Sequence, residues 1–135
     1  MKIKKYRYFA SDFETTVYKG QTYTEVWASA SVELNTEDVH IFHSIGEQLQ
    51  YFISLKHNVI AYFHNLKFDG NFWLSYLTVD LGFKQAYEVL KDGDFPIVKW
   101  KNEKDMDNNT FKYAISDMGQ WYTIIIKINN VFIEI

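Results

Sequence analysis

Apolar positions in the first 63 residues change their spacing along the chain, which predicts strands alternating with a helix. Residues 6–12 alternate as in a strand, and the face that carries Asp12 continues to Glu14. Residues 22–34 have alternating and aromatic character suited to one or two more strands, and a short one follows at residues 40–42. Val59–Phe63 is apolar throughout, as expected of a central strand that is covered on both faces.

Two helices are predicted, one on each side of this apolar strand. Ser44 and Glu47 have the spacing of a capping box, and apolar residues then recur on one helical stripe as far as Ile53. The second helix is expected to run to about Leu81, with Gly82 placed for a C-terminal cap. Its inward positions are predicted to be Phe72, Trp73, Tyr76 and Leu77.

From Phe83 onward the pattern is that of β-structure. Asp92-Gly93 is a hairpin signal between residues 86–90 and 95–100, and Pro96 favours an edge strand there. A polar loop at residues 101–109 precedes the last predicted strands. These are residues 110–116, 121–128 and 131–135, with the last two joined at Asn129-Asn130.

The order of elements predicts one α/β (α+β) domain. Residues 1–82 form its sheet-plus-helices half, and residues 83–135 form a β-hairpin region. The apolar strand pattern continues to Ile135, so we expect part of the sheet to be left uncovered. An uncovered apolar face favours self-association.

Composition excludes several classes of protein. The chain has 135 residues, a net charge of −3 and no cysteine, so disulfide frameworks and thiolate zinc sites are excluded. Proteins that wrap duplex DNA are usually basic, and this chain is not. No apolar run reaches the roughly 20 residues of a membrane span, so we expect a cytoplasmic protein without a membrane partner.

Three carboxylates suggest a metal site. Asp12 and Glu14 point to the same side of their strand, about 6–7 Å apart. Asp69 follows the apolar segment that ends at Phe63. Convergent carboxylates are hard oxygen ligands of the kind that Mg²⁺ or Mn²⁺ require. That chemistry usually serves phosphoryl transfer through a pair of ions roughly 3.5–4 Å apart.

Two of these stretches carry a family resemblance. Residues 12–15 (Asp-Phe-Glu-Thr) resemble the first exonuclease motif of family B DNA polymerases. Residues 64–70 (His-Asn-Leu-Lys-Phe-Asp-Gly) resemble the second, in the form found in protein-primed polymerases of phages and linear plasmids. Residues 115–122, with their Met-Gly-Gln-Trp-Tyr core, are also similar to that exonuclease domain. The resemblance implies a partial ribonuclease-H-like 3′–5′ exonuclease fold with a β-rich C-terminal extension.

The resemblance also implies roles for individual residues. It makes Asp12, Glu14 and Asp69 the catalytic residues and the ligands of a two-ion Mg²⁺ or Mn²⁺ site. Other matching positions contact single-stranded DNA, or DNA and the terminal priming protein. For these, the alternatives are a strand residue, a helix cap and buried packing. The positions are Thr15, Asn65, Phe68 and Phe72 for single-stranded DNA, and His64 for DNA or the priming protein.

The third motif of the family, Tyr-x-x-x-Asp, has no suitable match. The only such pattern is Tyr76–Asp80, and a helical rise of about 1.5 Å per residue puts Asp80 roughly 16 Å from Asp69. No shared pair of ions spans that distance, so the chain is expected to be truncated before the third motif. The resemblance implies exonuclease activity for the family, and this chain is expected to lack the fourth carboxylate and the tyrosine that the third motif supplies.

The sequence is consistent with two functions. The first is a fragment of a proofreading exonuclease domain that hydrolyses 3′ ends of single-stranded DNA. The alternative is an inactive exonuclease-like module that binds single-stranded DNA or a protein, such as a phage-encoded interaction protein.

Overall fold

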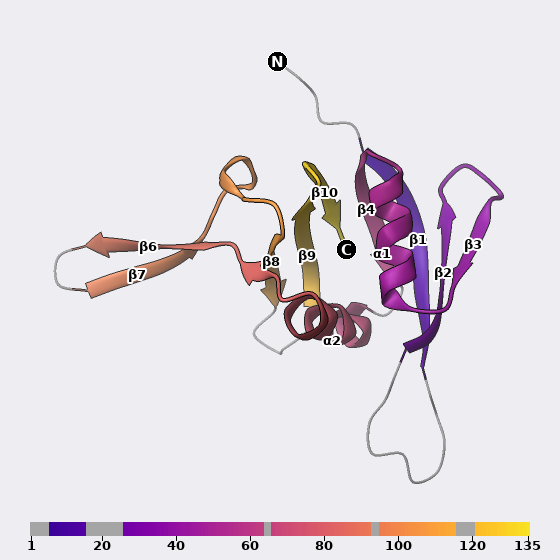
Figure 1. Ribbon diagram of the computed structural model, residues 1–135, viewed down its shortest axis with the longest axis horizontal. Coiled ribbons are helices and arrows are strands. Elements are labelled where there is room, and N and C mark those ends of the chain that lie inside the picture. The colour runs from indigo at the N-terminus through magenta and orange to yellow at the C-terminus, as the bar shows by residue number, and fades with distance from the viewer. Residues whose placement is uncertain (1–5, 16–25, 64–65, 93–94, 116–120) are drawn as a thin grey trace, which may run out of the picture.

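The structure is a computed structural model in which an eight-stranded mixed sheet and two helices make up the main body (Figure 1). It describes residues 6–15, 26–63, 66–92, 95–115 and 121–135. The strands of the sheet, in spatial order, are β3 (Val39–Phe42), β2 (Val26–Glu33), β1 (Tyr6–Thr15), β4 (Asn58–Phe63), β10 (Val131–Glu134), β9 (Trp121–Ile128), β8 (Thr110–Ile115) and β5 (Lys84–Gln85).

Strand β1 has an antiparallel neighbour on one side and a parallel neighbour on the other. It pairs antiparallel with β2, where Asp12 is opposite Ala30, and parallel with β4, where Ser11 is opposite Phe63. Strand β4 also pairs in parallel with β10, which places the C-terminal strands in the same sheet as the first half of the chain. The backbone N–H of Phe132 donates to Oδ1 of Asn58 at 2.9 Å and strengthens this junction.

The two helices cover one face of the sheet. Helices α1 (Ile45–Ser54) and α2 (Leu66–Ser75) pack on the side chains of β1, β4 and β9 that point to this side. Apolar side chains from both helices and all three strands are removed from water there, which supplies the main driving force for folding. The fully buried members include Phe9, Phe52, Val59, Trp73, Leu77 and Ile124.

The opposite face of β3, β2, β1 and β4 carries no helix among the described residues. Tyr62 is 54% exposed and Ile41 is 70% exposed, and Tyr8 stacks on Tyr62 with ring centroids 6.5 Å apart. The prediction that Val59–Phe63 is covered on both faces is therefore wrong. Only alternate residues of this strand reach the helices, because strand side chains alternate between faces.

The predicted helix signals are confirmed. Ser44 is the N-cap of α1 and its Oγ accepts from the backbone N–H of Glu47 at 3.1 Å, while the Glu47 carboxylate accepts from the N–H of His43 at 2.7 Å. Helix α2 continues as a π-helical turn, Tyr76–Asp80. Gly82 follows with φ +67°, a left-handed conformation that favours glycine after a helix.

The C-terminal strands agree with the predicted β-region. Asn129 and Asn130 both have positive φ, as a two-residue turn between β9 and β10 requires.

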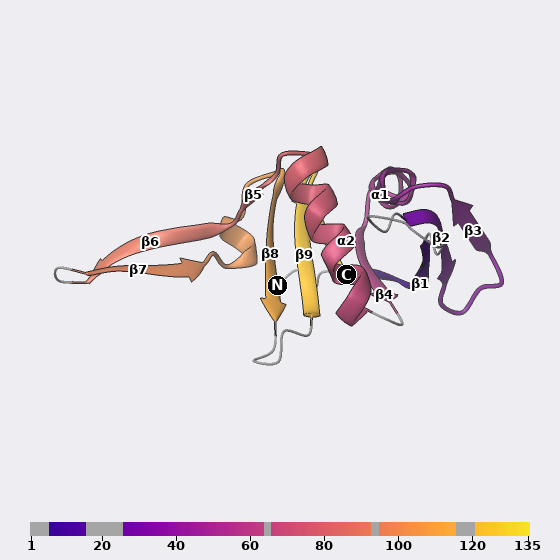
Figure 2. The same cartoon turned by 90° about the horizontal axis from the view of Figure 1, so that it is seen from below.

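Strands β6 (Tyr87–Asp92) and β7 (Phe95–Trp100) form a separate two-stranded arm that projects from the main body in both views (Figures 1 and 2). The parallel strand β5 and the short 3₁₀ helix Glu103–Asp105 were not predicted. Within the described ranges, none of the helices is long and apolar enough to cross a membrane.

Candidate functional site

The first carboxylate motif lies where β1 extends beyond its parallel neighbour. Strand β4 ends at Phe63, opposite Ser11, whereas β1 continues to Thr15. Helix α2 then begins at Leu66, so its first turn follows closely on the end of β4. The two motifs therefore leave adjacent strands in the same direction, which is the edge where open α/β sheets tend to place their sites.

Asp12 and Glu14 occupy the exposed positions of this extension. They alternate with Ser11 and Phe13, which are buried, as the period of two in a strand dictates. Oδ1 of Asp12 accepts from the backbone N–H of Phe13 at 3.0 Å. The Asp12 carboxylate is thus fixed locally while it stays open to solvent.

Asp69 is buried, in contrast to Asp12 and Glu14. It lies in the first turn of α2, is 2% exposed, and its Oδ2 has no hydrogen-bond partner. Burial, and to a lesser degree the negative charge of Asp12, raise the pKa of Asp69 to about 6. The effect of Asp12 on Asp69 shows that the two motifs come within electrostatic reach of one another.

The structure brings these carboxylates together only in part. In the portion of the chain that is described, no group of three or more His, Cys, Asp or Glu side chains is arranged to hold a metal ion. Among the described residues, the candidate cation ligands are thus Asp12 and Asp69. Glu14 lies two residues beyond Asp12, on the same exposed face of β1. Two carboxylates with one unpartnered buried oxygen do fit a hard cation such as Mg²⁺ or Mn²⁺, because such a cation would remove the repulsion between them.

The other predicted site residues are described to different extents. Phe72 is half-buried and its ring meets Phe13 edge to face, with centroids 6.4 Å apart. Thr15 ends β1 and Phe68 lies in α2, but their side chains are outside the described part of the structure. His64 and Asn65 lie outside the described residues altogether, as do residues 116–120 of the third local match.

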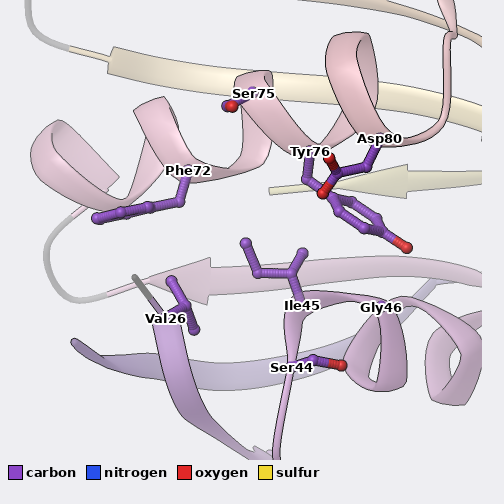
Figure 3. A pocket seen from close by; sticks show the side chains of 8 residues that line it. All are labelled: Val26, Ser44, Ile45, Gly46, Phe72, Ser75, Tyr76 and Asp80. Atoms are coloured by element: carbon purple, nitrogen blue, oxygen red, sulfur yellow. The ribbon is translucent and has the colours of Figure 1, made fainter. Parts of the chain in front are cut away.

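A cleft of about 620 Å³ separates the first turn of α1 from the far end of α2 (Figure 3). Phe72 and Ile45 supply apolar walls, and Tyr76 and Asp80 lie side by side at its other end. A Cβ on Gly46 would lie 2.8 Å from the Tyr76 hydroxyl, so glycine at this position lets the two elements approach. The remaining lining residues are Val26, Ser44 and Ser75.

Two buried polar features were not predicted from the sequence. The hydroxyls of Ser11 and Ser31 lie 2.6 Å apart, and Nε2 of Gln48 donates to Ser31 at 2.7 Å beneath α1. Trp73 is fully buried, yet its Nε1 has no partner. The sequence signal that could have linked Trp73 to Asp69 is their spacing of four residues, which puts both on one side of the same helix.

Comparison with known proteins identifies relatives of most of the chain. No family model matches it. It is 36% identical to the DNA polymerase of Bacillus phage phi29 over 128 residues, which cover 93% of this chain and 18% of that polymerase. It is 37% identical to the DNA polymerase of Bacillus phage PZA over 120 residues, covering 87% of this chain and 17% of that protein.

Solved structures give the same result. Phi29 DNA polymerase complexed with primer-template DNA matches with a TM-score of 0.65 and 28% identity, over 96% of this chain and 20% of that one. Phi29 DNA polymerase complexed with single-stranded DNA matches with a TM-score of 0.64 and 29% identity, over 94% and 20%. The chain spans about a fifth of the length of these polymerases. It is therefore a homologue of the phi29-type phage DNA polymerases and has the mixed α/β fold of the region that it matches.

Proposed function

We propose that this chain carries part of the metal-dependent active site of a 3′–5′ exonuclease domain and acts on 3′ ends of single-stranded DNA. The observation that carries the proposal is the coupled Asp12–Asp69 pair. Asp12 is exposed to solvent, and Asp69 is buried with an oxygen that has no partner. The pair lies in a region homologous to DNA polymerases, one of which has been solved with single-stranded DNA.

Asp69 and Asp12 would hold the cation, which is Mg²⁺ or Mn²⁺. When bound, such a cation lowers the pKa of a water ligand and stabilises an oxygen that leaves phosphorus. Asp69 would contribute Oδ2 from the first turn of α2, and it must be deprotonated to do so. Asp12 contributes the second charge, and its hydrogen bond to the N–H of Phe13 keeps the carboxylate oriented. Phe72, beside Phe13, offers an aromatic surface on which a base can stack.

A second candidate is a module that binds single-stranded DNA without cleaving it. The specific observation in its favour is that the described residues contain the Asp12–Asp69 pair but no group of three metal-ligating side chains. Removing one carboxylate from a two-ion site removes the cation that activates the water, and losses of several kcal/mol in the barrier are then expected. Binding depends on other groups and would survive.

One experiment separates the two candidates. A labelled single-stranded oligonucleotide is incubated with the chain, and digestion and binding are measured on the same preparation with Mn²⁺ and with EDTA. Asp12→Ala and Asp69→Ala test the pair, and Asp38→Ala, an exposed aspartate elsewhere, is the matched control. We expect slow, EDTA-sensitive digestion that both site variants lose and the control keeps. Binding without digestion would support the module, and absence of both would overturn both proposals.

A further inference from the structure

Two buried polar groups on α2 are left without partners, and they are chemically complementary. Oδ2 of Asp69 is an acceptor, and Nε1–H of Trp73 is a donor only. Asp69 is 2% exposed and Trp73 is fully buried, so bulk water does not reach either group. Buried polar groups are nearly always hydrogen-bonded, so two such groups on one helix call for an explanation.

The helix brings these groups within reach of each other. Residues four apart lie on the same side of a helix, with Cβ atoms about 5–6 Å apart. Helical side chains also tilt toward the N-terminus, so the indole of Trp73 extends over the turn that carries Asp69. The two groups are not bonded to each other in the structure, so the bond proposed below requires the Asp69 carboxylate to rotate toward the indole N–H.

Aromatic packing fixes Trp73 relative to both carboxylate motifs. Its ring lies 5.8 Å from that of Phe13 and 6.0 Å from that of Phe63, measured between centroids. Phe13 is the neighbour of Asp12 in β1, and Phe63 is the last residue of β4. The indole is therefore held against the two strands that lead into the site, while its N–H stays available.

We propose that Trp73 is a positioning residue, whose indole N–H donates to the Asp69 carboxylate and orients it toward the cation shared with Asp12. Donors behind a metal-ligating carboxylate fix its orientation, and their loss typically costs about 10–100-fold in metal affinity. This role rests on the proposed cation site. The hydrogen bond itself can be tested without any cation.

The test uses the whole chain labelled with ¹⁵N-tryptophan, and the Trp73 indole signal is assigned from its loss in Trp73→Phe. In metal-free buffer at pH 7.5, we expect Asp69→Ala to move the indole proton upfield and to accelerate its exchange with solvent. Asp38→Ala is expected to change neither. An indole proton whose exchange rate is the same in Asp69→Ala and in the parent would overturn the inference, whatever the outcome for the cation.

Mn²⁺ affinity provides the second measurement. We expect Trp73→Phe to weaken Mn²⁺ binding by about 10-fold or more. The matched control is Phe63→Leu, which removes a ring that packs on Trp73 and leaves the indole N–H, and it should change the affinity by less than about threefold. Equal losses in both variants would show that packing alone matters and would contradict the positioning role. If the parent chain itself binds no Mn²⁺, the proposed cation site fails, and the indole measurement still decides the Trp73–Asp69 bond.

Discussion

The two faces of strand β1 carry alternate residues of one ten-residue strand and meet opposite environments. On one face Phe9 and Phe13 are buried under the helices, and the ring of Phe13 packs beside that of Trp73. On the other face Tyr8 and Asp12 are exposed, beside the exposed Tyr62 of β4. Apolar content does not distinguish the faces, since aromatic residues occupy both. What distinguishes them is whether another element packs on top.

The candidate site draws on both faces. Asp69 comes from the helix-covered side and Asp12 from the exposed side, and they interact because β4 ends at Phe63, one residue short of the position opposite Asp12. Beyond that point β1 no longer has β4 as its neighbour, and the first turn of α2 follows. The candidate site therefore combines a buried carboxylate with one that is exposed to solvent.

The largest expected difference between the faces is in stability. Phe9→Ala should lower the free energy of unfolding by about 3–5 kcal/mol, because it leaves a cavity in the helix-covered core. Tyr62→Ala should lower it by less than about 1 kcal/mol, because the ring is already half in water. Urea denaturation of both variants measures this. Similar losses in the two variants would mean that the second face is also covered.

An intermediate effect on stability is expected at Asp69. The pKa of folded Asp69 is about 6, above its usual 3.8, so the folded state binds this proton more tightly than the unfolded state. The resulting stability is present below about pH 4 and is lost as the pH rises to about 6. Asp69→Asn should therefore raise the free energy of unfolding by about 2 kcal/mol at pH 7.5 and by much less at pH 4.

Asp38→Asn is the matched control for this prediction, since Asp38 is exposed and lies outside the Asp12–Asp69 pair. It should change stability by less than about 0.5 kcal/mol at either pH. Denaturant midpoints at the two pH values give the comparison. A gain for Asp69→Asn that is the same at pH 4 and pH 7.5 would show that titration of this carboxylate is not the cause.

Substitutions on the helix-free face are expected to change the free energy of unfolding least. Their effect is instead on the association of two copies of the chain. Ile41 and Tyr62 lie on this face and are more than half exposed. Contiguous apolar patches above a few hundred Å² tend to associate, so we expect two copies of the chain to pair through it as concentration rises. The double variant Ile41→Lys/Tyr62→Lys should sediment as a monomer at every concentration, with stability within about 1 kcal/mol of the parent. Sedimentation velocity on both proteins checks this, and a parent that is itself monomeric throughout would exclude the association.

Local signals in the sequence predicted much of this fold. The Ser44–Glu47 cap, the conformation of Gly82 and the Asn129-Asn130 turn each depend on a few neighbouring residues, and each is present as predicted. The two carboxylate motifs were found for the same reason, because their spacing reflects a strand end and a helical first turn. The resemblance of most of the chain to DNA polymerases was likewise contained in the sequence.

Other features were decided only when distant segments packed together. The pairing of β10 with β4 joins residues about seventy positions apart, and no local pattern specifies it. The burial of Asp69, its coupling to Asp12 and the unpartnered N–H of Trp73 depend on how α2 lies against β1 and β4. The sequence by itself determined most of the strands, helices and turns, since these follow from the period and the conformational preference of nearby residues. Only the tertiary structure decided which faces are covered and which carboxylates meet, because burial and charge coupling are set by neighbours in space.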